Sequence, residues 1–140
     1  MDPVGIKEHP RSGEAIRAEL SARSVLVVED EALICVETAD CFERQGFEVH
    51  VAVSAEDAMR LLGEGLRVDI LFTDVNLAGR MDGVALARFA RALDSALVVV
   101  YTSGTVNAVA AGVPGSQFIA KPYSPDRVGR MLARLAMVTA

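Results

Sequence analysis

The sequence contains no tryptophan, only two cysteines, and no hydrophobic run approaching the roughly 20 residues that a membrane-spanning helix needs. Residues 1–12 are polar and charged, unlike a signal peptide. Cys35 and Cys41 lie six residues apart in one predicted helix and face different sides of it, so we expect no disulfide between them. These absences predict a protein that does not enter a membrane and that works in the reducing cytoplasm.

Basic residues are also scarce, because 14 lysines and arginines stand against 19 acidic residues and the net charge is −5. Binding to a phosphate backbone requires a basic face, so nucleic acid is not an expected partner. The 140 residues, 51% of them hydrophobic, predict one compact domain that buries about two-thirds of its chain surface. Lys7 and Lys121 are the two lysines, which makes Lys121 conspicuous inside the predicted domain.

Apolar runs alternate with helical patterns from Ser24 onward and predict a (βα)₅ order. The predicted strands are residues 25–28, 47–51, 68–73, 97–101 and 118–120. Helices are expected at 31–45, from the N-cap Ser54, after Gly83, and from the N-cap Ser124 with Pro125 at the first helical position. Right-handed crossovers turn this order into an α/β fold with a doubly wound, parallel, five-stranded sheet.

Two segments depart from that regular order. Residues 1–23 contain Pro3, Gly5, Pro10 and Gly13 and read as an N-terminal extension with at most one short helix over 13–23. Its role stays open between loose packing on the domain and contact with a partner or a second copy. Only residues 106–111 have a helical pattern between the fourth and fifth strands, so the fourth helix is expected to be shortened.

Polar groups follow four of the predicted strands at their C-terminal ends: Glu29-Asp30, Asp74, Thr102-Ser103 and Lys121. In a parallel sheet these ends lie side by side, and ligands bind in the crevice beyond them. Three carboxylates offer the hard oxygen ligands that suit a Mg²⁺-like ion, whereas no clustered His and Cys have zinc spacing. Each residue alone has an ordinary alternative role as a cap, turn or surface residue, but together they predict a site for a cation and a phosphoryl group.

This set of residues resembles the receiver domain of bacterial two-component response regulators, which has a flavodoxin-like fold. The resemblance covers about residues 24–138, in the family's order and close to its spacing. The segments that carry it are Val25-Leu26-Val27-Val28-Glu29-Asp30-Glu31, Phe72-Thr73-Asp74-Val75-Asn76, Tyr101-Thr102-Ser103-Gly104 and Lys121-Pro122-Tyr123.

The resemblance implies a role for each matching position. Asp74 matches the aspartate that accepts the phosphoryl group, and Lys121 matches the lysine that pairs with that group. The implied ligands of Mg²⁺ or Mn²⁺ are Asp30 and Asp74 directly, Asn76 through its backbone carbonyl, and Glu29 through water.

The remaining matches concern the switch. Phe118 matches an aromatic residue that changes rotamer on activation, and the peptide bond between Lys121 and Pro122 matches one that is typically cis. The switch hydroxyl is Ser103 or Thr102, and the small residue Gly104 that follows favours Ser103.

Two departures from the family pattern stand out. The segment from Asp74 to Gly83 is one residue longer than in many receivers, which bears on access to the site. The shortened fourth helix puts in doubt the output surface that the family commonly uses.

The resemblance predicts a stand-alone receiver that takes a phosphoryl group from a sensor histidine kinase or a histidine phosphotransfer protein and switches the binding of an unknown downstream partner. It would not be an enzyme beyond self-catalysed phosphoryl acceptance and slow autodephosphorylation. One alternative is a pseudo-receiver that binds partners without phosphorylation. Another is a haloacid-dehalogenase-type phosphatase, which is disfavoured because such sites place a second aspartate where this chain has Asn76.

Overall fold

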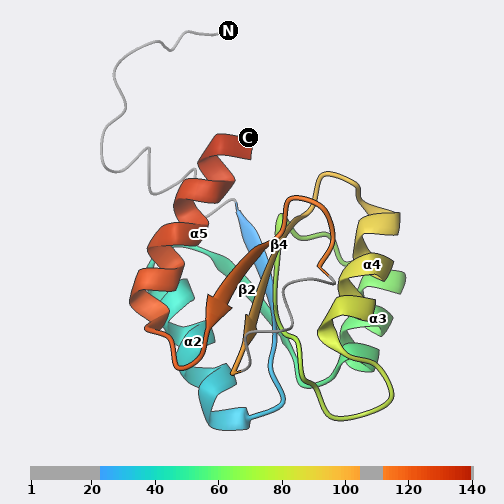
Figure 1. The fold of residues 1–140 in the computed structure, drawn as a ribbon. Helices are drawn as coiled ribbons and strands as arrows, with labels where there is room; N and C mark the ends of the chain where they lie inside the picture. The colour runs from blue at the N-terminus through green and yellow to red at the C-terminus, as the bar shows by residue number, and fades with distance from the viewer. Residues whose placement is uncertain (1–22, 105–111, 140) are drawn as a thin grey trace, which may run out of the picture.

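A computed structural model describes residues 23–104 and 112–139 and shows one parallel sheet between two pairs of helices (Figure 1). The strands are β1 Ser24–Val28, β2 Glu48–Ala52, β3 Ile70–Asp74, β4 Val98–Ser103 and β5 Gln117–Ala120. The helices are α2 Ala32–Arg44, α3 Ala55–Gly63, α4 Gly83–Leu93 and α5 Pro125–Thr139. The sheet order is β2-β1-β3-β4-β5, with every neighbouring pair parallel, which confirms the predicted fold class.

All five predicted strands are present, with ends shifted by one or two residues from the apolar runs. The largest extension adds Thr102 and Ser103 to β4, because backbone pairing with β5 continues beyond the last apolar side chain. The short helices predicted at 13–23 and 106–111 fall almost entirely outside the described residues. The predicted N-cap at Ser54 is confirmed, since its hydroxyl accepts a hydrogen bond from Asp57 N at 3.0 Å.

Strand position explains the burial pattern of the sheet. Central strands β1 and β3 are buried along their whole length because helices cover both of their faces. The edge strands β2 and β5 keep exposed and half-buried residues. The polar residues at the C-terminal ends of β1 and β3 are therefore held by strands that are themselves buried in the core.

Two hydrophobic clusters lie on opposite faces of the sheet. One, around Leu26, Leu71 and Val99, packs under α3 and α4. The other, around Val27 and Phe72, packs under α2 and α5. Side chains alternate between these two faces along each strand. The position of a residue in its strand therefore determines whether its side chain points toward α3 and α4 or toward α2 and α5.

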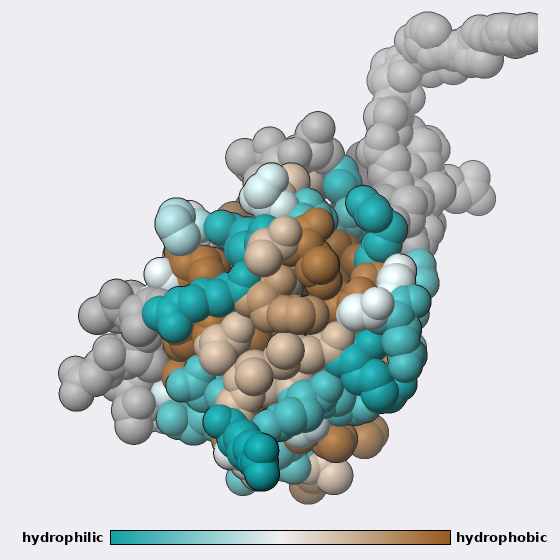
Figure 2. Space-filling model, turned by 90° about the vertical axis from the view of Figure 1, so that its right-hand side faces the viewer, coloured by the Kyte–Doolittle hydropathy of each residue, from teal (hydrophilic) through white to brown (hydrophobic). Residues whose placement is uncertain are grey.

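A space-filling view of the face formed by α3 and α4 shows apolar side chains gathered along its centre, with polar residues around them (Figure 2). Half-buried Met59, Leu62 and Leu66 belong to the cluster beneath this face. Across the residues that the structure describes, no helix is both long and apolar enough to cross a bilayer.

Candidate functional site

Backbone hydrogen bonds between neighbouring strands continue one residue beyond the C-terminal ends of β1, β3 and β5, and they fix the start of the loop that follows each strand. Glu29 N donates to Ala52 O at 3.1 Å, and Val75 N donates to Thr102 O at 2.9 Å. Lys121 N likewise donates to Ser103 O at 2.9 Å. The residues at the C-terminal edge of the sheet therefore start from backbone positions that the sheet itself sets.

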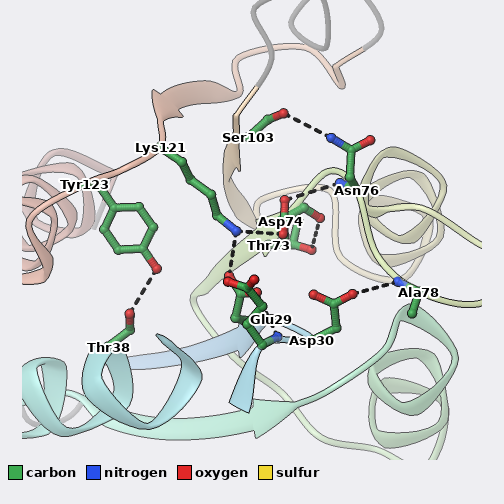
Figure 3. A network of polar contacts seen from close by, with 11 residues as sticks. Glu29, Asp30, Thr38, Thr73, Asp74, Asn76, Ala78, Ser103, Lys121 and Tyr123 are labelled. Atoms are coloured by element: carbon green, nitrogen blue, oxygen red, sulfur yellow. Dashed lines mark hydrogen bonds and ion pairs between the residues drawn. The ribbon is translucent and has the colours of Figure 1, made fainter. Parts of the chain in front are cut away.

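The Lys121 ammonium group lies between the carboxylate of Glu29, which directly follows β1, and that of Asp74, the last residue of β3 (Figure 3). Its Nζ atom is 2.9 Å from Glu29 Oε1 and 2.8 Å from Asp74 Oδ2. Both carboxylates are buried, since only 2% of Glu29 and 5% of Asp74 is exposed. Such charge-assisted hydrogen bonds are short and strong, and they compensate part of the cost of burying the charges.

Burial and the two ion pairs both influence the pKa values of Lys121 and Glu29. Burial by itself lowers the pKa of Lys121, but its hydrogen bonds and charge interactions with Asp74 and Glu29 outweigh that effect and raise the pKa above its ordinary value. Burial raises the pKa of Glu29, although hydrogen bonds from Glu31 N and Lys121 oppose it. Lys121 is therefore firmly cationic at the centre of the site.

Asp30 completes a cluster of three carboxylates with Glu29 and Asp74, in which one oxygen of each lies within 4.8 Å of the others. Lys121 pairs with two of these three carboxylates, and within the described part of the chain no cationic side chain pairs with Asp30, so negative charge is left uncompensated there. Hard oxygen donors around an uncompensated negative charge fit a divalent ion of the Mg²⁺ or Mn²⁺ class. Asp30 is also held in place, because its Oδ2 accepts a hydrogen bond from Ala78 N at 2.9 Å.

Asn76 connects the acidic cluster to Ser103. Its backbone N–H donates to Asp74 Oδ1 at 3.2 Å, and its side-chain amide donates to Ser103 Oγ at 3.2 Å. Figure 3 shows Ser103 above Asp74, with Asn76 beside both. Ser103 is thus a member of the polar network around Asp74.

The neighbouring hydroxyl of Thr102 is placed differently. Thr102 precedes Ser103 on β4, so the two side chains leave opposite faces of the sheet. Its Oγ1 atom is buried and has no hydrogen-bond partner among the described residues, and only 1% of Thr102 is exposed. Of the two hydroxyls left open by the sequence, only that of Ser103 has a hydrogen bond to a residue that contacts Asp74.

The backbone of Asp74 is packed too tightly for a side chain at position 83. A Cβ atom at Gly83 would collide with the Asp74 carbonyl oxygen. The same oxygen accepts a hydrogen bond from Thr73 Oγ1 at 2.9 Å. The loop returns at this point, where Gly83 N donates to Val75 O at 2.8 Å. The collision that a Cβ atom would have with the Asp74 carbonyl explains why the sequence has glycine there.

The remaining predicted residues lie along β5 and the loop after it. The Lys121–Pro122 peptide bond is cis. Phe118 is half-buried against the cluster under α3 and α4, opposite Tyr101 of β4. Phe118 lies on the same side of the sheet as Ser103.

Sequence reasoning assigned no role to a contact between Thr38 and Tyr123. The two hydroxyls are 2.9 Å apart, and the Tyr123 ring packs edge-on against Phe72 with ring centroids 5.5 Å apart. This contact joins α2 to the loop that carries Lys121 (Figure 3). The one available signal was a threonine on the apolar face of the helix, which alone does not identify a partner 85 positions away.

Comparisons with known proteins agree with this geometry. A family model described as the response regulator receiver domain matches residues 25–133. The chain is 31% identical over 127 residues to the sensor kinase CckA of Brucella abortus (strain 2308), a match that covers 87% of this chain and 13% of that kinase.

Solved structures give the same result. A response regulator receiver protein from Sinorhizobium medicae WSM419 is 27% identical, with a TM-score of 0.79 and coverage of 84% of this chain and 97% of that one. The receiver domain of the hybrid histidine kinase CckA is 26% identical, with a TM-score of 0.70 and coverage of 81% and 98%.

Proposed function

We propose that this chain, which belongs to the response regulator receiver domain family, accepts a phosphoryl group on Asp74 and thereby switches the binding of a partner protein. The family acts in two-component signalling and is not a family of classical enzymes. The observation that carries the proposal is the position of Lys121 Nζ, 2.8 Å from one oxygen of Asp74 and beside a cluster of three carboxylates.

In this proposal the phosphoryl group comes from a phosphohistidine of a sensor histidine kinase or a histidine phosphotransfer protein. The phosphorus–nitrogen bond breaks, a bond between phosphorus and a carboxylate oxygen of Asp74 forms, and the leaving imidazole takes up a proton. Phosphoryl transfer asks the protein mainly for alignment and for stabilisation of charge. Lys121 supplies a fixed positive charge, and Asn76 N–H holds one oxygen of Asp74 in place.

The residues that would hold Mg²⁺ or Mn²⁺ are Asp30 and Asp74 directly, Asn76 by its backbone carbonyl, and Glu29 through water. When bound, the ion would neutralise the repulsion between the Asp74 carboxylate and the incoming phosphoryl oxygens. Asp30 suits direct coordination because it is more exposed than Glu29 and is not paired with Lys121.

We further propose that the phosphoryl oxygens attract the Ser103 hydroxyl away from Asn76 and that Phe118 follows into the vacated space. The support is that Ser103 contacts Asn76 and that Phe118 lies on the same face of the sheet. Phosphorylation would in this way shift an equilibrium between two conformations that exist beforehand.

A histidine-bearing partner would approach along a groove beside Lys121. This groove has a volume of about 470 Å³ and lies between α2 and the loop after β5, with Ile34, Glu37, Thr38, Lys121, Pro122, Tyr123 and Pro125 as its lining. Leu33 and Val36 are exposed on the adjacent surface of α2, at 71% and 64%. Both cysteines are free, in keeping with the proposed action in the cytoplasm.

Incubation with acetyl phosphate and Mg²⁺, followed by intact mass measurement, tests the proposal. We expect the gain of one labile phosphoryl group, which hydroxylamine removes because it cleaves acyl phosphates. Continuous turnover of acetyl phosphate without a labelled protein would indicate a phosphatase, and no reaction of either kind would indicate a pseudo-receiver. The residue two positions after Asp74 argues against the phosphatase, because Asn76 has an amide, which cannot act as a general acid or base and which donates to Ser103.

A further inference from the structure

The loop of residues 75–82, between β3 and α4, is held from two sides by carboxylates. Ala78 N donates to Asp30 Oδ2 at 2.9 Å, and Arg80 N donates to Glu56 Oε2 at 2.9 Å. Figure 3 shows the first of these contacts beside the acidic cluster. Glu56 belongs to the first turn of α3 and lies outside that cluster.

Gly79 lies between the two anchored amides and contacts Glu56 closely. It has a φ of +108°, which a residue with a side chain rarely adopts. A Cβ atom there would lie 2.9 Å from Glu56 Oε1 and 3.2 Å from Oε2. The Glu56 carboxylate therefore both accepts a hydrogen bond from the loop and fills the space beside its glycine.

The ends of the loop are fixed independently of Glu56. Gly83 N bonds to Val75 O at 2.8 Å, and the Asp82 side chain caps α4 by accepting from Ala85 N at 2.9 Å. Loss of the Glu56 contact should consequently loosen the middle of the loop without unfolding it. The middle is where Ala78 meets Asp30.

We propose that Glu56 is a positioning residue for the cation site and acts through the loop on Asp30. The inference rests on the proposed function. Glu56 holds Arg80 and Gly79, which places the Ala78 N–H against one oxygen of Asp30 and leaves the other oxygen for the ion. A ligand carboxylate oriented in advance loses less rotational freedom on binding, and partners of metal ligands commonly influence affinity in this way.

Charge alone offers a competing explanation, because any carboxylate near a cation strengthens its binding. Two variants separate the two effects. Glu56→Gln removes the charge but keeps an acceptor oxygen of nearly the same shape. Asp57→Asn removes a charge at the next position, where the carboxylate pairs with Arg60 of α3 at 2.8 Å and is not an anchor of the loop.

Calorimetric titration of the whole chain with Mg²⁺, combined with hydrogen exchange of the Ala78 amide, tests the proposal. Glu56→Ala should weaken Mg²⁺ binding about fivefold and accelerate Ala78 exchange. Glu56→Gln and Asp57→Asn should behave like the wild-type chain in both measurements. Gly79→Ala pushes a methyl group against Glu56 and should reproduce both effects of Glu56→Ala. It tests the same contact independently if Glu56→Ala fails to fold.

Three results would overturn the inference. Unchanged Mg²⁺ affinity in a folded Glu56→Ala protein would show that the contact has no influence on the ion. Equal weakening in Glu56→Gln and Glu56→Ala would assign the effect to charge. A wild-type chain that binds no Mg²⁺ would overturn the proposed cation site as well, so failure of that site is distinguishable from failure of this inference alone.

Discussion

Lys121 and Asp74 form an ion pair of 2.8 Å between residues that are 47 positions apart and lie at the ends of β5 and β3. Strand β4 separates these two strands in the sheet, so the lysine side chain reaches across it to the aspartate. A second contact of 2.9 Å ties Lys121 to Glu29 of the segment after β1. One ammonium group therefore links both central acidic positions and holds a positive charge where a phosphoryl group on Asp74 would arrive.

Asp74→Asn should abolish phosphorylation while the fold survives. The amide is nearly the same size as the carboxylate but does not act as a nucleophile toward phosphorus. The measurement is intact mass after treatment with acetyl phosphate and Mg²⁺, with circular dichroism as the check of folding. Asp94→Asn, at the C-terminal end of α4, is a control that should label fully. Stoichiometric labelling of a folded Asp74→Asn protein would disprove the assignment.

Asp30→Ala should weaken Mg²⁺ binding more than Glu29→Ala does. We expect a direct ligand to contribute more than one that acts through water, and Glu29 is already neutralised in part by Lys121. A difference of about tenfold between the two dissociation constants, measured by titration, is the expected outcome. Equal affinities in the two variants would mean that their assigned roles are wrong.

Ser103→Ala should still accept a phosphoryl group but should lose the conformational response near Phe118. Asp74, Lys121 and the acidic cluster are unchanged in this variant, so labelling with acetyl phosphate should persist. The response is measured as the change in amide exchange of β5 upon addition of beryllium fluoride. A normal response in Ser103→Ala would assign the switch to another group.

Thr102→Val should retain the response and stabilise the protein. The Thr102 hydroxyl is buried without a hydrogen-bond partner in the described structure, so replacing it with a methyl group removes the cost of keeping a polar atom away from water. The free energy of unfolding in urea should rise by about 1 kcal/mol. Destabilisation together with a lost response would identify Thr102 rather than Ser103 as the switch hydroxyl.

Tyr123→Phe should destabilise the protein by about 1 kcal/mol, because it removes one partly buried hydrogen bond while the ring stays packed on Phe72. Thr38→Val removes the other partner of the same bond. In a double-mutant cycle of urea unfolding, the two changes should be clearly non-additive. Additive effects would show that the contact between the two hydroxyls contributes nothing to stability.

The order of strands and helices follows from local patterns in the sequence. Unbroken aliphatic runs such as residues 25–28 are typical of strands buried on both faces, and caps such as Ser54 mark helix starts. The ends of the strands were less predictable. Ser103, for example, belongs to β4 because its backbone pairs with β5, and its polar side chain gives no sign of this in the sequence. The grouping of Glu29, Asp74 and Lys121 was also predictable, since parallel topology brings strand ends together.

Contacts between loops and helices could not be predicted in the same way. The hydrogen bond of Thr38 with Tyr123, and that of Glu56 with Arg80, join segments whose separation in the chain carries no periodic signal. The different surroundings of the Ser103 and Thr102 hydroxyls also became visible only in the structure, because adjacent residues on a strand point to opposite faces of the sheet.

The sequence by itself determined the fold class and the residues at the C-terminal edge of the sheet, because hydrophobic periodicity and chain direction are local properties. The tertiary structure decided which oxygen and nitrogen atoms meet there. Lys121 pairs with Glu29 and Asp74 rather than with Asp30, and Ala78 holds Asp30. The physical reason is that hydrogen bonds and ion pairs depend on separations of about 3 Å, which packing of the whole chain sets and which no local pattern specifies.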